Sequence, residues 1–226
     1  MSLIIRKLQN IFVKYIYADH NSSSIVKEKL NDLLKILDQN NKTGLNVGAG
    51  DTKIHPRIKN LDIISGHQID IVGFVEDIPC PDESFDLVVT QECLEHVKDP
   101  FKGMNEMYRV LKKGGKIYLQ LPFIIGYHPG PTDFWRFTVE GIEELAIRSN
   151  FNLLEKGIVV GGGSGYYRIS VEFFAVLFSI PFDFFYKSFK VFFALLLFPL
   201  KAFDYIFRYS HQKNRIPGGF YLIAQK

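Results

Sequence analysis

The stretch LNVGAGDT, residues 45–52, determines the fold of this chain: a short apolar strand runs into a turn with glycines at positions 48 and 50. Glycine lets the backbone come close to a bound molecule, because it carries no side chain. The next apolar stretch, residues 59–63, ends in Asp62. A carboxylate at that place can accept hydrogen bonds from both hydroxyls of a ribose. The pattern therefore favours a site for a nucleoside.

The same residues argue against a dinucleotide. The third glycine of a dinucleotide-binding turn would fall at Lys53, Asp51 would put a negative charge beside a pyrophosphate, and Pro56 stands where the phosphate-binding helix should run. Asp62 also follows Gly50 by 12 residues, rather than the roughly 20 of a dinucleotide-binding unit. A nucleoside without phosphates suits these residues better, and S-adenosylmethionine is such a molecule.

Strands and helices alternate along the rest of the chain. Near-continuous apolar strands between helices indicate an α/β fold with a doubly wound, mostly parallel sheet, in which an apolar helical insertion precedes the last strand. We expect strands over residues 45–47, 59–63, 84–90, 116–121, 151–160 and 220–226, with a further short strand in the region of 69–75. Helices are expected over 3–17, 25–37, 100–111 and 139–149, the third helix ending at Lys112-Lys113-Gly114-Gly115.

Four pieces in order carry a family resemblance. LNVGAG (45–50), NLDI (60–63), EDIPCPDESFDLVVTQECLEHVKDP (76–100) and YRVLKKGGKIYLQLP (108–122) resemble class I S-adenosylmethionine-dependent methyltransferases of the type 11 kind. The resemblance implies a Rossmann-like methyltransferase sheet, methyl transfer as the activity and S-adenosylmethionine as the cofactor. HPGPTDFWRFTVEGIEEL (128–145) further resembles a bacterial subgroup associated with surface-polysaccharide assembly, which implies O-methylation of a glycan or a lipid-linked saccharide.

The resemblance also implies which residues meet the cofactor. Gly48 and Gly50 would border its methionine part, Asp62 would bind the ribose, and the acidic loop 74–78 would face adenine, with the base stacked on Phe74. The full predicted set is Gly48, Ala49, Gly50, Asp62, Ile63, Phe74, Val75, Glu76, Asp77 and Gln91, the last near the sulfonium. No metal is expected, because the two cysteines have no metal-ligand spacing, and His96 is interpreted as a packing residue at the start of a helix.

An acceptor pocket is predicted just after the fifth strand, where open α/β sheets bind ligands. His128, Asp133, Trp135 and Arg136 fall within nine residues there. His128 is the first candidate for the base that deprotonates an acceptor hydroxyl, because imidazole titrates near neutral pH. Asp133 is the second, as a base or as the group that orients a histidine, and Arg136 is a candidate to hold an anionic group of the acceptor. The alternative is a Pro/Gly-rich loop whose tryptophan plugs the core.

A phenylalanine-rich stretch separates the sixth strand from the last. Of the 21 phenylalanines, 12 lie in residues 171–207, followed at once by four basic or histidine side chains. We expect two or three short helices broken near Pro181 and Pro199. The predicted division is N-terminal helices (1–40), a methyltransferase domain (41–163 with 216–226) and this insertion (164–215). The insertion has three candidate roles: a membrane-interface helix pair, a homodimer interface, or a cap over the substrate.

Composition limits the partners. A net charge of +3 over 226 residues gives no concentrated basic face, so nucleic acid is not an expected partner. No uncharged apolar run reaches 18 residues and no signal peptide is visible, which predicts a cytoplasmic protein, with peripheral attachment to the inner face of the plasma membrane as a further hypothesis. Two other functions stay open: methylation of a small lipid such as a quinone precursor, and a non-catalytic membrane-associated protein on a methyltransferase fold.

Overall fold

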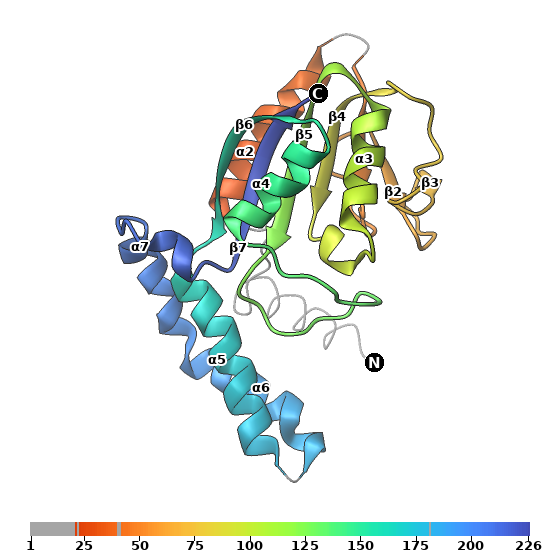
Figure 1. Ribbon diagram of the computed structural model, residues 1–226. Coiled ribbons are helices and arrows are strands. Elements are labelled where there is room, and N and C mark those ends of the chain that lie inside the picture. Colours follow the sequence, from red (N-terminus) through yellow and green to blue (C-terminus); the bar gives the residue numbers. More distant parts are fainter. Residues whose placement is uncertain (1–20, 22, 40–41, 181) are drawn as a thin grey trace. The chain divides into compact units, whose positions relative to one another are not determined.

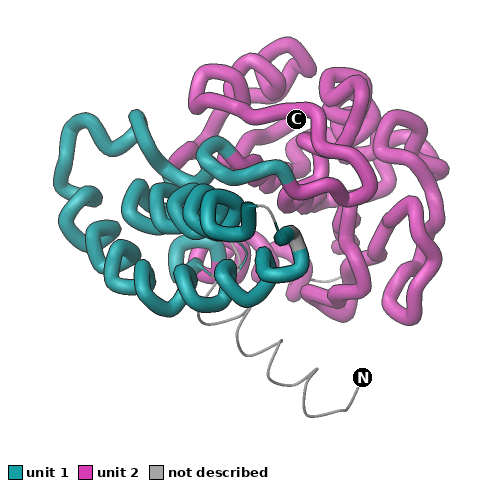
Figure 2. The backbone as a smooth tube through the Cα atoms, turned by 90° about the horizontal axis from the view of Figure 1, so that it is seen from below, with its two compact units in different colours: residues 1–26, 123–127, 158–219 teal, residues 27–122, 128–157, 220–226 magenta. Residues whose placement is uncertain are grey.

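The computed structural model describes residues 21, 23–39, 42–180 and 182–226 (Figure 1). The helix predicted over residues 3–17 lies outside them. The chain divides into two compact units (Figure 2). The sheet unit comprises residues 27–122, 128–157 and 220–226, and the helical unit takes its described residues from 1–26, 123–127 and 158–219.

Seven strands form one sheet in the order β3-β2-β1-β4-β5-β7-β6. The strands β1 to β5 pair in parallel. Strand β7 runs antiparallel to β5, because Gly114 N bonds to Lys226 O while Phe123 N bonds to Gly218 O. This confirms the predicted doubly wound, mostly parallel sheet. The strands are β1 (Gly44–Val47), β2 (Ile58–Asp62), β3 (Ile71–Val72), β4 (Phe85–Gln91), β5 (Leu111–Pro122), β6 (Asn152–Val160) and β7 (Gly219–Gln225).

Strand β1 lies inside the sheet and is buried over its whole length, which is why its sequence is an almost continuous apolar run with one amide. Asn46 in this strand donates its side-chain N–H to Asn60 Oδ1 on β2 at 3.3 Å. Asn60 in turn donates to the backbone oxygens of Thr52 and Gln68, at 3.0 and 2.9 Å. These bonds shape residues 48–57, all of which the structure describes, into a loop that contains no helix.

Helices cover the sheet on both faces, α3 and α4 on one and α2 on the other (Figure 1). Helix α3 starts where the side chain of Asp99 accepts Lys102 N, with Pro100 at its first position, and α4 starts where Thr138 Oγ1 accepts Gly141 N. The helices of this part are α2 (Ser24–Leu34), the 3₁₀ helices η3 (Lys35–Asp38) and η4 (Leu94–His96), α3 (Pro100–Val110) and α4 (Val139–Arg148).

The third strand, expected to be short in the region of residues 69–75, pairs over Ile71–Val72. One expected boundary was wrong. Helix α3 ends at Val110, and the sequence KKGG at 112–115 lies inside β5 rather than at the helix end. Gly114 has a φ of +77° there, and hydrogen bonds join residues 114 and 115 to Lys226. Glycine allows a local kink at residue 114, and the hydrogen bonds to β7 keep these residues in the sheet. Strand β5 therefore starts earlier than expected, at Leu111.

The helical unit is built from α5 (Gly162–Ser179), η5 (Asp183–Phe185), α6 (Tyr186–Leu196), η6 (Phe198–Ala202), α7 (Phe203–Phe207) and η7 (Lys213–Arg215). Helices α5 and α6 pack through a small core of Tyr167, Val171 and Ala194, and Tyr167 Oη donates to Ala194 O at 3.0 Å. Helix α5 is longer than the short helices expected, because it begins in the glycine run at Gly162. Glycine is needed there for close packing, since a Cβ at Gly163 would lie 2.6 Å from Leu200 O. Among the described residues, none of the helices combines the length and apolar character needed to cross a bilayer.

Candidate functional site

The glycine turn and Asp62 are in direct contact. Gly48 and Gly50 have φ angles of +69° and +54°, in the left-handed region that glycine adopts most easily. A Cβ at Gly48 would lie 2.5 Å from Cys93 Sγ, whereas a Cβ at Gly50 would meet nothing within 4 Å. Gly50 N donates to Asp62 Oδ2 at 2.8 Å. The turn is therefore closed on its Cys93 side, open beside Gly50, and fastened to the end of β2.

A cavity of about 390 Å³ opens at this edge of the sheet, within the size range of small-molecule and cofactor sites. Six predicted cofactor residues line it: Gly48, Asp62, Ile63, Phe74, Val75 and Glu76. Ala49, Gly50, Asp77 and Gln91 do not contribute to the lining among the described residues. Gln91 Nε2 instead donates to Gln120 Oε1 at 3.3 Å.

Further residues line the cavity. Glu92, which the resemblance places with Gln91 near the sulfonium, has a φ of +54° and is one of them. Residues 130–132 and Phe134 line the same cavity, from the predicted acceptor loop. The acceptor loop is held there by bonds to the β4–α3 connection: Phe134 N donates to Glu95 O at 2.8 Å, and Trp135 Nε1 donates to Val97 O at 2.8 Å. Trp135 is 42% exposed, so it fastens the loop and does not plug the core.

The three predicted catalytic residues meet, but two of them are occupied with each other. Arg136 donates to both oxygens of Asp133 at 2.6 Å, and this pairing lowers the pKa of the Asp133 carboxyl to about 2. Such a carboxylate is a weak base near neutral pH. Asp133 Oδ2 also accepts His128 N at 2.9 Å and lies 3.5 Å from His128 Nδ1. Asp133 is thus placed to orient His128, and Arg136 to hold Asp133.

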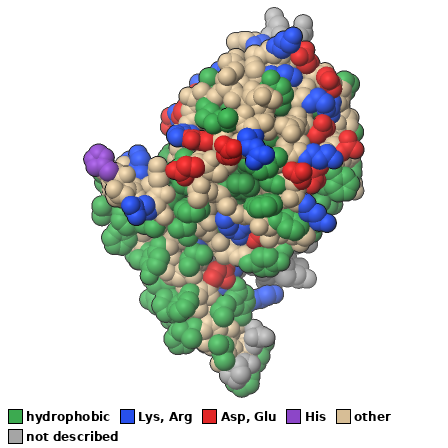
Figure 3. Space-filling model, viewed as in Figure 1, with side chains coloured by type: hydrophobic (Ala, Val, Ile, Leu, Met, Phe, Trp, Pro, Cys, Tyr) green, Lys and Arg blue, Asp and Glu red, His purple; other side chains and the backbone are tan. Residues whose placement is uncertain are grey.

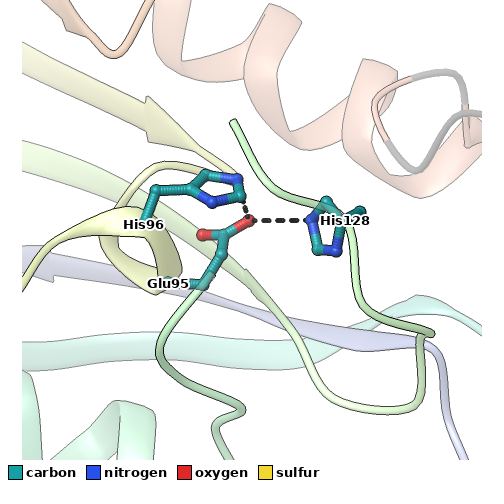
Figure 4. Close-up of side chains that lie close together, drawn as sticks. All are labelled: Glu95, His96 and His128. Carbon is teal, nitrogen blue, oxygen red and sulfur yellow. Dashed lines mark ion pairs between the residues drawn. The ribbon is translucent and has the colours of Figure 1, made fainter. Parts of the chain in front are cut away.

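Glu95 is the residue that sequence reasoning missed. Its side chain is fully buried, and burial raises the pKa of its carboxyl. Neither of its carboxylate oxygens has a hydrogen-bond partner among the described residues. Glu95 Oε1 faces His96 Nε2 at 3.5 Å and His128 Nε2 at 3.7 Å (Figure 4). The predicted packing histidine, His96, therefore belongs to a cluster with the predicted base.

Comparison with known proteins points to one kind of domain. Residues 45–119 match the model of the methyltransferase domain family. A ubiquinone/menaquinone biosynthesis C-methyltransferase of Vibrio parahaemolyticus is 26% identical over 138 residues, which are 61% of this chain and 46% of that protein. The chain spans about half the length of the curated relatives it matches.

Solved structures share the fold. Phosphoethanolamine N-methyltransferase 2 of Haemonchus contortus, in complex with S-adenosyl-L-methionine, is similar with a TM-score of 0.54 at 16% identity, covering 96% of this chain and 57% of that one. The [4+2]-cyclase SpnF is similar with a TM-score of 0.52 at 18% identity, covering 92% and 84%. Residues 45–119 thus carry the signature of a methyltransferase domain, and the chain has the fold of a protein solved with S-adenosyl-L-methionine bound.

The cavity of this methyltransferase domain fits S-adenosylmethionine. The Asp62 oxygens each accept one backbone N–H, from Gly50 at 2.8 Å and from Ile64 at 3.1 Å. Each oxygen keeps a further lone pair, so a ribose diol can be bound as well. Phe74 is 65% exposed at the cavity, which makes its ring available for stacking against a base.

Proposed function

We propose that this protein transfers the methyl group of S-adenosylmethionine to a hydroxyl of a saccharide carried on a membrane lipid. The apolar surface of the helical unit supports the membrane part of this proposal, and the resemblance of residues 128–145 to a subgroup associated with surface-polysaccharide assembly supports the saccharide. A lipid-linked acceptor stays in the membrane, so an enzyme that modifies it has to work at the bilayer surface.

Large apolar side chains on α5, α6 and α7 point outward (Figure 3). We call this the apolar surface; it includes Phe173, Val176, Leu177, Phe178, Val191, Phe192, Leu195, Leu196, Phe203 and Ile206, all exposed by 44–61%. Basic residues follow it, with Arg208 over the rings of Tyr205 and Tyr209 at 4.3 and 5.8 Å. Exposed apolar side chains next to cations and aromatic rings are typical of helices that lie in a membrane interface. A bilayer with anionic headgroups is therefore the partner that fits this surface best.

Methyl transfer to a hydroxyl requires few catalytic groups from the protein. S-adenosylmethionine supplies an activated methyl group, whose sulfur leaves as a neutral thioether. The protein has to place the acceptor oxygen in line with that methyl, keep water away and take up the hydroxyl proton. Residues 130–132 and Phe134 line the cofactor cavity from the acceptor loop. We place His128 of the same loop beside the acceptor hydroxyl.

Membrane docking has a direct test. The full chain is expected to float with vesicles that contain anionic lipid, and less with neutral vesicles, because the basic residues favour anionic headgroups. A double change, Phe184→Asp with Phe192→Asp, should remove most of the flotation, since both side chains are exposed, by 73% and 56%. Ile147→Asp is the matched control, because Ile147 is 52% exposed on α4 of the sheet unit. A chain that stays vesicle-free, and that sediments as a dimer, would refute docking and favour a homodimer interface.

The acceptor is tested by labelling. Membranes incubated with the protein and methyl-labelled S-adenosylmethionine are expected to give label in the lipid extract. Mild acid, which cleaves a saccharide from its phosphate-linked lipid, should then release the label into water. Label that survives acid and stays with the lipid would contradict the saccharide acceptor. Calorimetry with S-adenosylmethionine alone provides the control: without binding, the non-catalytic alternative would hold.

A quinone precursor is the second candidate acceptor. It is favoured by the similarity to the Vibrio parahaemolyticus ubiquinone/menaquinone biosynthesis C-methyltransferase, and it fits an apolar surface equally well. The same extract separates the two acceptors, because mass spectrometry would then find the added methyl on an aromatic ring with an isoprenoid tail.

A further inference from the structure

Glu95, His96 and His128 form a cluster that an ordinary methyl-transfer site does not explain. One ligand atom from each residue lies within 4.8 Å of one from each of the others. Two imidazoles and one carboxylate make up the ligand set of many mononuclear sites for divalent transition metals. From this geometry we infer that the protein binds one divalent ion of the zinc class at Glu95, His96 and His128.

The spacing suits such an ion. Zinc holds nitrogen and oxygen ligands at about 2.0–2.2 Å, so two ligand atoms at a tetrahedral ion are roughly 3.3–3.6 Å apart. Glu95 Oε1 lies 3.5 Å from His96 Nε2 and 3.7 Å from His128 Nε2. Small side-chain movements would bring all three atoms to bonding distance. Magnesium is a poorer choice, because it prefers oxygen ligands and water.

The outer nitrogen of His96 is hydrogen-bonded as in metal-bound histidines, and that of His128 lies between Arg136 and Asp133. His96 Nδ1 bonds to Thr132 O, and since a carbonyl can only accept, the proton is on Nδ1 and a lone pair is left on Nε2. His128 Nδ1 lies 3.3 Å from Arg136 Nη2, which can only donate, and 3.5 Å from Asp133 Oδ2. Binding of an ion at Nε2 therefore requires the proton of His128 to move to Nδ1, facing Asp133, and the contact with Arg136 to give way. Carboxylate and carbonyl partners of this kind fix the orientation of metal-binding histidines.

The burial of the Glu95 carboxylate is a second observation that points to an ion, independent of the spacing. Glu95 is fully buried, and both of its oxygens lack a hydrogen-bond partner among the described residues. A buried carboxylate in that condition is costly unless a positive charge lies against it. An ion between the three side chains would provide that charge. His96 lines the cofactor cavity and the His128 side chain is 34% exposed, so the ion could be reached from solvent.

A catalytic role for this ion rests on the proposed function. An acceptor hydroxyl bound to the ion would have a lowered pKa and would release its proton to water. Its oxygen would then form a bond to the methyl carbon while the carbon–sulfur bond breaks, with that electron pair staying on sulfur. His128 would act as a ligand in this scheme and not as the base. His96 separates the two schemes, because a base mechanism at His128 does not need it.

Metal binding is measured without cofactor or acceptor. The full chain, freed of metal with a chelator, is titrated with Zn²⁺ by calorimetry and with Co²⁺ by visible absorption. We expect one ion per chain, a Co²⁺ spectrum of low coordination number, and a higher Tm when Zn²⁺ is present. Glu95→Gln, which keeps the shape of the side chain, and His96→Ala should each lower the affinity at least about 100-fold. His67→Ala, at an exposed histidine of the same unit, should leave it unchanged.

The outcomes are separable. Absence of stoichiometric binding, or binding that survives both Glu95→Gln and His96→Ala in chains whose circular dichroism is unchanged, would overturn the inference. Failure of the labelling experiment with intact metal binding would instead reject the proposed acceptor. Chelator that abolishes labelling without changing the affinity for S-adenosylmethionine would place the ion on the acceptor side of the reaction.

Discussion

An Asp62→Ala protein is expected to bind S-adenosylmethionine about 10²–10⁴-fold more weakly than the unchanged protein. A hydrogen bond to a charged group contributes about 1.5–3 kcal/mol, so two bonds to the ribose correspond to roughly 3–6 kcal/mol. The variant would also loosen the turn, because Asp62 accepts the backbone N–H groups of Gly50 and Ile64. Isothermal titration calorimetry measures the affinity directly.

Asp77→Ala is the matched control for this experiment. Its carboxylate lies on the predicted adenine-facing loop, but it is exposed and does not line the cavity. We expect its affinity to stay within a factor of three of the unchanged protein. Asp62→Asn keeps the shape of the side chain and should fall between the two. If the Asp62→Ala protein binds S-adenosylmethionine as tightly as the Asp77→Ala protein, Asp62 does not bind the ribose.

The cofactor edge of the sheet could be predicted because its cues are local. Two glycines after an apolar strand, and an acid at the end of the next strand, determine backbone direction within a few residues. The parallel register of β1 and β2 then brings Gly50 and Asp62 together. Phe74 and Glu76 follow from the same short stretch of chain, and both line the cavity.

Glu95 could not be predicted, because its burial depends on residues far along the chain. The segment from Thr132 to Trp135 closes over it through bonds to Glu95 O and His96 O. A sequence pattern shows a charged residue near a helix start, where it is usually solvated. One signal for the buried glutamate was available in the sequence. In CLEHV (93–97), which follows a buried strand, Glu95 stands between an apolar residue and a histidine. The KKGG stretch was misplaced for a similar reason, since β7 holds it in the sheet from more than 100 residues away.

A His128→Ala protein is expected to lose about 10²–10⁴-fold in turnover, the size of effect that removing a group which assists proton removal usually has. The affinity for S-adenosylmethionine should not change, because His128 does not line the cofactor cavity among the described residues. Both schemes for His128, base and metal ligand, predict this loss. Turnover is measured as transfer of label to the membrane extract at saturating cofactor.

Asp133→Asn provides the graded comparison. The asparagine keeps an oxygen that can accept His128 N, but it pairs more weakly with Arg136. In the unchanged protein that pairing holds Asp133 beside the imidazole. Because Asp133 acts through His128, we expect a smaller loss than for His128→Ala, and no further loss when both changes are combined. Such non-additivity marks groups that work as a unit. Unchanged turnover in His128→Ala, with label still transferred, would take His128 out of the reaction, and losses that simply add would separate Asp133 from it.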